Sequence, residues 1–150
     1  MVPAVPPQDC PADIIFVLDS SGSIGSGNFA LMKSFLSQLV VRLDIDSGKT
    51  LVGVVTYSSY VETGFNLNAH TSVASVQSAI WALRYTGGGT NTAGALAHVR
   101  TSIMTSAAGD RSDVSNVVVV LTDGHSNNRA ATLVCAMLRL LILFIYQHYY

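Results

Sequence analysis

The sequence predicts an α/β fold in which helices cover both faces of a parallel sheet. Short apolar runs typical of buried strands alternate along the chain with segments whose apolar residues recur at helical spacing. The 150 residues suffice for one domain with a hydrophobic core. A composition of 49% hydrophobic and 11% charged residues indicates a compact protein rather than a disordered one.

The first strand is expected at 14–18, a continuous apolar run of the kind found in strands covered on both faces. Ser26 or Asn28 is expected to cap the helix that follows. One face of this helix is apolar and consists of Phe29, Met32, Leu36, Leu39, Val40 and Leu43. A turn at 46–48 leads to a second buried strand at 51–57, which is rich in β-branched residues.

Apolar and polar residues alternate over 61–67, which predicts a half-exposed edge strand. Ser72 is expected to open a second helix that the glycines from Gly87 onward end, and Trp81 to pack this helix onto the sheet. Its inward residues are predicted to be Val73, Val76, Ile80 and Leu83. A third helix is expected over 92–104, with Ala93, Leu96, Ala97 and Ile103 facing inward.

The clearest strand signal is the apolar run 117–121. After Asn128 a helix is expected to run to about residue 140, and a strand to follow it. The stretch 133–150 is strongly apolar apart from Arg139 but is shorter than a typical membrane span, so we expect a buried helix and strand in preference to a membrane segment.

The ends of the chain carry two further features. Residues 1–12 are proline-rich and lack the pattern of a signal peptide, which predicts a flexible leader. Cys10 and Cys135 lie near opposite ends, where they can form a disulfide or be unrelated thiols.

Oxygen-bearing side chains follow two of the predicted strands and a glycine-rich loop. Asp19, Ser21 and Ser23 come after the first strand, Thr90 follows three glycines, and Asp123 comes after the strand 117–121. In a parallel sheet, ligands bind beyond the carboxyl ends of strands where the strand order reverses. If these strands are neighbours there, the three loops form one site of hard oxygen ligands suited to Mg²⁺.

Hydroxyl ligands are neutral, so a cation held chiefly by them keeps much of its charge. Such a cation can accept a carboxylate from a partner at an open position. Each segment taken alone is also compatible with an ordinary turn, and only their combination favours a metal site.

The sequence argues against several other functions. No Gly-x-Ser-x-Gly elbow surrounds Ser23 or Ser26, no Cys/His cluster offers a zinc site, and the P-loop-like 48–50 has Leu43 where the first glycine is required. We therefore expect no enzymatic activity. A net charge of −1 without a basic cluster predicts no attraction to nucleic acid or to an anionic membrane.

Asp19-Ser20-Ser21-Gly22-Ser23, the run 88–96 and Leu121-Thr122-Asp123-Gly124 together resemble the metal-ion-dependent adhesion site of the von Willebrand factor type A family. The sequences of the strands most resemble those of extracellular matrix members of the family, of the collagen VI and matrilin type. The resemblance implies a doubly wound, Rossmann-like fold whose mostly parallel sheet has one antiparallel edge strand, consistent with 61–67. It implies Mg²⁺ or Mn²⁺, with Ser21, Ser23 and Thr90 as direct ligands and Asp19 and Asp123 acting mostly through water.

The resemblance also implies adhesion to an extracellular matrix partner such as collagen, and an extracellular or cell-surface location. It covers 13–132, and 133–150 is expected to be a divergent end of the same domain with incomplete final strands. Two alternatives stay open: an intracellular module for protein-complex assembly, and a structural domain whose cation only stiffens the loops.

Overall fold

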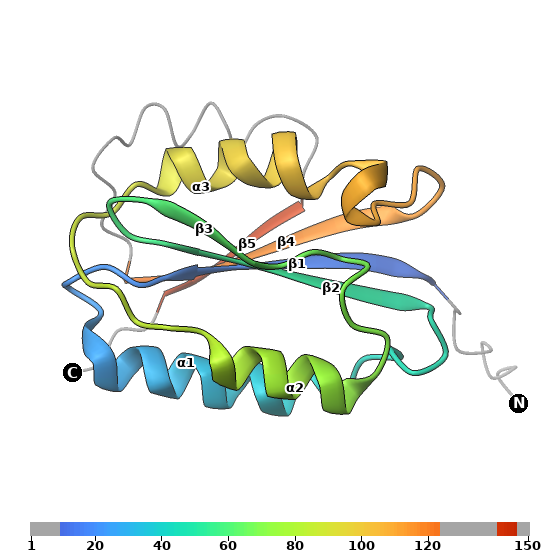
Figure 1. The fold of residues 1–150 in the computed structure, drawn as a ribbon, viewed down its shortest axis with the longest axis horizontal. Helices are drawn as coiled ribbons and strands as arrows, with labels where there is room; N and C mark the ends of the chain where they lie inside the picture. The colour runs from blue at the N-terminus through green and yellow to red at the C-terminus, as the bar shows by residue number, and fades with distance from the viewer. Residues whose placement is uncertain (1–9, 124–140, 147–150) are drawn as a thin grey trace, which may run out of the picture.

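The computed structural model describes residues 10–123 and 141–146 and contains one five-stranded sheet between helices (Figure 1). The strands are β1 (Ala12–Asp19), β2 (Thr50–Tyr57), β3 (Val61–Phe65), β4 (Ser115–Thr122) and β5 (Leu141–Tyr146). The helices are α1 (Gly25–Val40), α2 (Val73–Ala82) and α3 (Thr92–His98), with a π-helical turn η1 (Val99–Ile103) and a 3₁₀ turn η2 (Ser106–Ala108).

The sheet is mostly parallel, with the strand order β3-β2-β1-β4-β5. β1 runs parallel to both β2 and β4, β4 runs parallel to β5, and β3 alone is antiparallel. α1 and α2 cover one face and α3 the other (Figure 1). The predicted doubly wound fold with one antiparallel edge strand is confirmed. Because β2 lies on one side of β1 and β4 on the other, the strand order reverses between β1 and β4.

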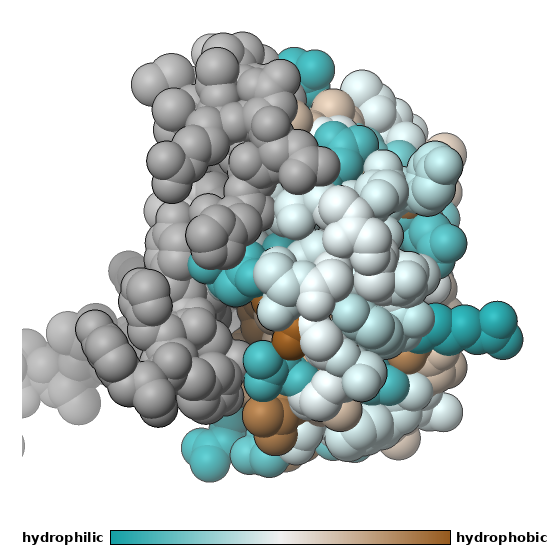
Figure 2. Space-filling model, turned by 90° about the vertical axis from the view of Figure 1, so that its left-hand side faces the viewer, coloured by the Kyte–Doolittle hydropathy of each residue, from teal (hydrophilic) through white to brown (hydrophobic). Residues whose placement is uncertain are grey.

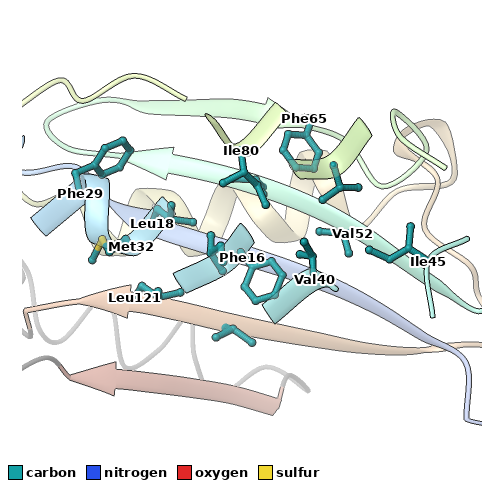
Figure 3. Close-up of a cluster of buried hydrophobic side chains, with 14 of the residues drawn as sticks. Phe16, Leu18, Phe29, Met32, Val40, Ile45, Val52, Phe65, Ile80 and Leu121 are labelled. Carbon is teal, nitrogen blue, oxygen red and sulfur yellow. The ribbon is translucent and has the colours of Figure 1, made fainter. Parts of the chain in front are cut away.

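Each face of the sheet has its own hydrophobic core. Phe16 and Leu18 of β1 point toward α1 and α2, whereas Ile15 and Val17 pack on the α3 side. Figure 3 shows the first cluster, in which side chains of the sheet meet those of α1 and α2. Since both faces of β1 are buried, its sequence is continuously apolar, as predicted.

The start of α1 differs from the prediction. The helix begins at Gly25 after Ile24, which already has helical backbone angles, and no side chain caps it. Ser26 and Asn28 therefore lie within the helix, and their assignment as caps is wrong. The reason is that the turn after β1 runs directly into the helix, leaving no extended residue at which a cap could form.

The helix α2 opens at Ser72 as predicted but ends at Ala82, earlier than the glycines from Gly87. Lys33 Nζ donates to the carbonyls of Trp81 and Leu83 and so binds the groups that α2 leaves unpaired at its end. The prediction for Trp81 is wrong: its side chain is half exposed, and Lys33 Nζ lies 5.7 Å from the ring centroid.

The third helix is interrupted as well. α3 gives way to the wider turn η1. Leu96 and Ile103 are buried as predicted, whereas Ala93 and Ala97 are only half-buried. Ala95 and Val99 are fully buried instead, because the buried face of the helix lies slightly to one side of the predicted face.

The predicted terminal strand is present as β5, whereas the helix expected before it lies outside the described residues. Among the residues described, no helix has the length and apolar character needed to cross a membrane.

Candidate metal centre

The site begins with two neighbouring strand ends. β1 ends at Asp19 and β4 at Thr122, and the strands are paired in register up to Leu18 opposite Leu121. The Thr122 hydroxyl donates to Asp19 Oδ2 at 2.7 Å. Asp123, the next residue, is close enough for its charge to contribute to raising the pKa of Asp19. The pairing of β1 with β4 thus brings together two loops that the sequence places over 100 positions apart.

The loop after β1 places two hydroxyl groups beside the carboxylate. The backbone N–H of Ser21 donates to Asp19 Oδ1 at 2.8 Å, and Ser21 Oγ lies 3.2 Å from Ser23 Oγ. Asp19 and Ser21 are buried, whereas Ser23 is exposed. Neighbouring ligands in an octahedron with Mg–O distances of about 2.1 Å are about 3.0 Å apart. The two serine hydroxyls therefore have a spacing suited to adjacent ligands of one cation.

The glycine-rich loop docks directly onto the loop after β1. Gly22 N–H donates to the Gly88 carbonyl at 2.9 Å, and Gly87 N–H donates to the Ser20 carbonyl at 2.9 Å. Gly88 has φ +95°, and a Cβ added at Gly22 would lie 3.3 Å from the Gly88 oxygen. The glycines thus allow the two backbones to approach. Thr90, two residues beyond Gly88, is buried in the same loop.

Comparison with known proteins gives a family for this arrangement. The sequence model of the von Willebrand factor type A (VWA) domain matches residues 13–141. The chain belongs to this family. Von Willebrand factor A domain-containing protein 2 from Xenopus laevis is 40% identical over 124 residues, which are 83% of this chain and 16% of that protein. Matrilin-1 from Mus musculus is 41% identical over 118 residues, or 77% of this chain and 24% of that protein.

The VWA fold is also found in a solved structure of a mussel byssus protein. Proximal thread matrix protein 1, in a structure with a zinc-occupied MIDAS motif, superposes with a TM-score of 0.81 and 27% sequence identity. The match covers 91% of this chain and 38% of that chain. This VWA domain thus spans only a minor part of each of these relatives.

A second set of hydroxyl groups holds the loops of the VWA domain in place. Ser20 Oγ accepts a hydrogen bond from Thr86 N–H at 2.8 Å, and Thr86 Oγ1 lies 3.1 Å from Ser20 Oγ and 3.0 Å from Ser58 Oγ. Asn91 N–H donates to the Ser58 carbonyl at 2.8 Å. The roles of Ser20 and Thr86 in positioning these loops are not visible in the sequence, because their contacts join segments that are distant along the chain.

Burial governs the electrostatics of this site. Loss of hydration raises the pKa of the Asp19 carboxyl, and the hydrogen bonds from Ser21 and Thr122 only partly offset that effect. Burial likewise raises the pKa of Tyr57, and the nearby Asp19 charge adds to the shift. A bound cation would stabilise the ionised Asp19, so the residues present fit a divalent metal.

The candidate residues of this site are mostly hydroxyl-bearing, since Ser21, Ser23 and Thr90 accompany the acids Asp19 and Asp123. Within 10–123 and 141–146, no three His, Cys, Asp or Glu side chains form a metal-binding group. A cation held by these residues would therefore meet serine and threonine hydroxyls for most of its protein ligands.

Proposed function

We propose that this VWA domain is a protein-binding module that depends on a divalent cation, Mg²⁺ or Mn²⁺. The proposed site consists of Asp19, Ser21, Ser23, Thr90 and Asp123. The observation that carries the proposal is the pair of hydroxyls, Ser21 Oγ and Ser23 Oγ, 3.2 Å apart beside a buried carboxylate. The structure of proximal thread matrix protein 1 with zinc in its MIDAS motif supports a divalent metal.

The roles of the residues follow from their hydrogen bonds. Both oxygens of Asp19 already accept hydrogen bonds, from Ser21 N–H and the Thr122 hydroxyl, which favours an indirect role through water. Ser21, Ser23 and Thr90 are proposed as direct ligands, and Asp123 as a second indirect one. Because the direct ligands are uncharged, the cation would attract an acidic side chain of the partner.

The proposed partner is a protein of the extracellular matrix, such as a collagen, and the proposed location is extracellular or at the cell surface. The support is that Matrilin-1 and von Willebrand factor A domain-containing protein 2 share this domain, and neither name denotes an enzyme. We accordingly propose a binding role without catalysis.

Calorimetry of metal binding tests the site. Asp19→Ala and Thr90→Ala are each expected to weaken Mg²⁺ affinity at least about tenfold, which corresponds to about 1.4 kcal/mol. Thr101→Ala serves as the matched control, because its exposed hydroxyl bonds only to local groups in the α3–η1 segment. Unchanged Mg²⁺ affinity in both site variants would refute the assignment.

A pull-down from matrix extract, with and without EDTA, tests the dependence of partner binding on metal. Capture that EDTA abolishes is expected. Capture that survives EDTA would instead favour a cation that only stiffens the loops.

A further inference from the structure

A small pocket lies beside the candidate metal centre, between the turn that joins β2 to β3 and the loop containing Thr86. It is lined by Thr56, Tyr57, Ser58, Tyr60, Glu62 and Thr86. Its free volume is about 40 Å³, enough for about three water molecules or for the end of one side chain. The role proposed above for the metal site leaves this pocket without a function.

The pocket and the metal site share a wall. Ser58 and Thr86 line the pocket, and Thr86 N–H and Oγ1 both contact Ser20 Oγ, one residue from the proposed ligand Ser21. Glu62 is held next to this wall because it pairs with Thr56 across the β2–β3 ladder. A group seated in the pocket would therefore lie close to a carboxylate bound at the metal.

The chemistry of the lining favours a cation. Glu62 is the one carboxylate among the lining residues, and no lining residue is basic. Glu62 is exposed, and the Tyr60 side chain is 82% exposed. Among the described residues, no ion pair involves Glu62 and no ring contact involves Tyr60. A carboxylate beside an aromatic ring is suited to an arginine or lysine side chain.

The surrounding surface is consistent with polar recognition. Figure 2 shows the end of the molecule at which β1 ends, and its described surface is mostly neutral to hydrophilic with small hydrophobic patches. A partner that binds here would be selected by charge complementarity rather than by a large apolar patch.

We infer that the pocket binds an arginine or lysine side chain of the same partner whose carboxylate binds the metal. The inference rests on the proposed function in one respect, namely that the acidic group binds at the cation. The partner would then carry an acidic and a basic residue near each other, the first at the metal and the second between Glu62 and Tyr60.

The pocket is tested first without any metal. ¹⁵N-labelled protein in EDTA is titrated with Nα-acetyl-arginine amide and with the uncharged analogue Nα-acetyl-citrulline amide. Saturable shifts of the amide signals of residues 58–62 and 86 are expected with the arginine derivative. Citrulline is expected to bind about fivefold more weakly or worse, because it lacks the charge that pairs with Glu62.

Three variants make this titration specific. Glu62→Gln is expected to weaken arginine binding by the same factor, and Tyr60→Ala by about twofold through loss of the ring contact. Asp113→Asn removes the same charge from an exposed site before β4 and is expected to change nothing. Equal shifts with citrulline, or full binding by Glu62→Gln, would overturn the pocket assignment.

A second titration tests whether one partner uses both sites. The protein is titrated with glycine–serine peptides in the presence of Mg²⁺. Each peptide carries one glutamate and, one to six residues away from it, either an arginine or a citrulline. At one spacing or more, the arginine peptide is expected to bind several-fold more tightly than its citrulline counterpart, and Asp19→Ala to remove the contribution of the glutamate. If no spacing shows this advantage, the joint use of the two sites is refuted. Because the first titration contains no metal, failure of the metal site leaves its result unaffected.

Discussion

At the scale of single residues, the buried Asp19 carboxylate carries a cost in stability. Its side chain is fully buried, and the loss of hydration raises its pKa. A raised pKa in the folded state means that folding disfavours the ionised carboxylate. Without a cation, the ionised form that prevails at neutral pH therefore lowers the free energy of unfolding.

Asp19→Asn tests whether the buried charge lowers stability, because the substitution keeps the shape of the side chain and removes the charge. In EDTA at pH 7 the variant is expected to melt about 2–4 °C higher than the parent, as for about 1 kcal/mol in a domain of this size. Added Mg²⁺ should then stabilise the variant less than it stabilises the parent. The measurement is thermal unfolding followed by circular dichroism. A lower melting temperature in EDTA would show that the hydrogen bonds from Ser21 and Thr122 outweigh the desolvation of the charge.

A second residue-scale prediction concerns the buried ion pair at the opposite end of β1. Arg111 Nη2 lies 2.6 Å from Oδ1 of Asp13, a fully buried carboxylate, and the guanidinium also donates to the carbonyls of Gly48 and Lys49. Arg111→Ala leaves Asp13 without its charge partner, so we expect a loss of about 3–5 kcal/mol in the free energy of unfolding. Urea unfolding measures it. Arg100→Ala, at an exposed position, is the control, and equal losses in the two variants would contradict the argument.

At the scale of elements, the start of α2 is a helix cap that the sequence alone identified. The Ser72 side chain accepts from Ser75 N–H, and Ser75 Oγ in turn accepts from Ser72 N–H. Val73 N–H donates to Asp46 Oδ1 at 3.0 Å. These bonds satisfy donors that the first turn of a helix cannot pair internally.

Ser72→Ala is therefore expected to lower the free energy of unfolding by about 1 kcal/mol. Ser78→Ala, an exposed position within the same helix, is the matched control and is expected to be neutral or slightly stabilising, because alanine has the higher helix propensity. Urea unfolding of both variants gives the comparison. A loss in Ser78→Ala as large as that in Ser72→Ala would show that the cap contributes nothing specific.

At the scale of the whole molecule, local sequence patterns predicted the main strands and helices. The contacts between segments that are distant along the chain could not be predicted in this way. Strands β1, β2 and β4 were predictable because both of their faces are buried, which makes their sequences continuously apolar. The proposed ligands were recognisable because oxygen-bearing side chains follow two strands and a run of three glycines. No local pattern marks Asp13 and Arg111 as partners, nor the bonds between Thr86 and Ser58, since these contacts exist only once the chain has folded.

The convergence of the loops also has a thermodynamic consequence for the whole domain. Ser21, Thr90 and Asp123 are far apart in the unfolded chain, so a cation that binds all three loops binds the folded state alone. Mg²⁺ at about 100 times its dissociation constant should then stabilise the domain by about 2.7 kcal/mol. In a domain of this size, that corresponds to a rise of roughly 5–11 °C in melting temperature relative to EDTA.

Thermal unfolding in Mg²⁺ and in EDTA, at matched ionic strength, measures this shift. Thr90→Ala should lose most of it, whereas Thr101→Ala should keep it in full, because Thr101 bonds only to local groups in the α3–η1 segment. A shift that persists undiminished in Thr90→Ala would place the cation outside the glycine-rich loop. Equal melting temperatures in Mg²⁺ and EDTA for the unmodified chain would mean that the hydroxyl groups beside Asp19 hold no cation. In that case binding of an acidic partner would have to depend on the protein surface alone.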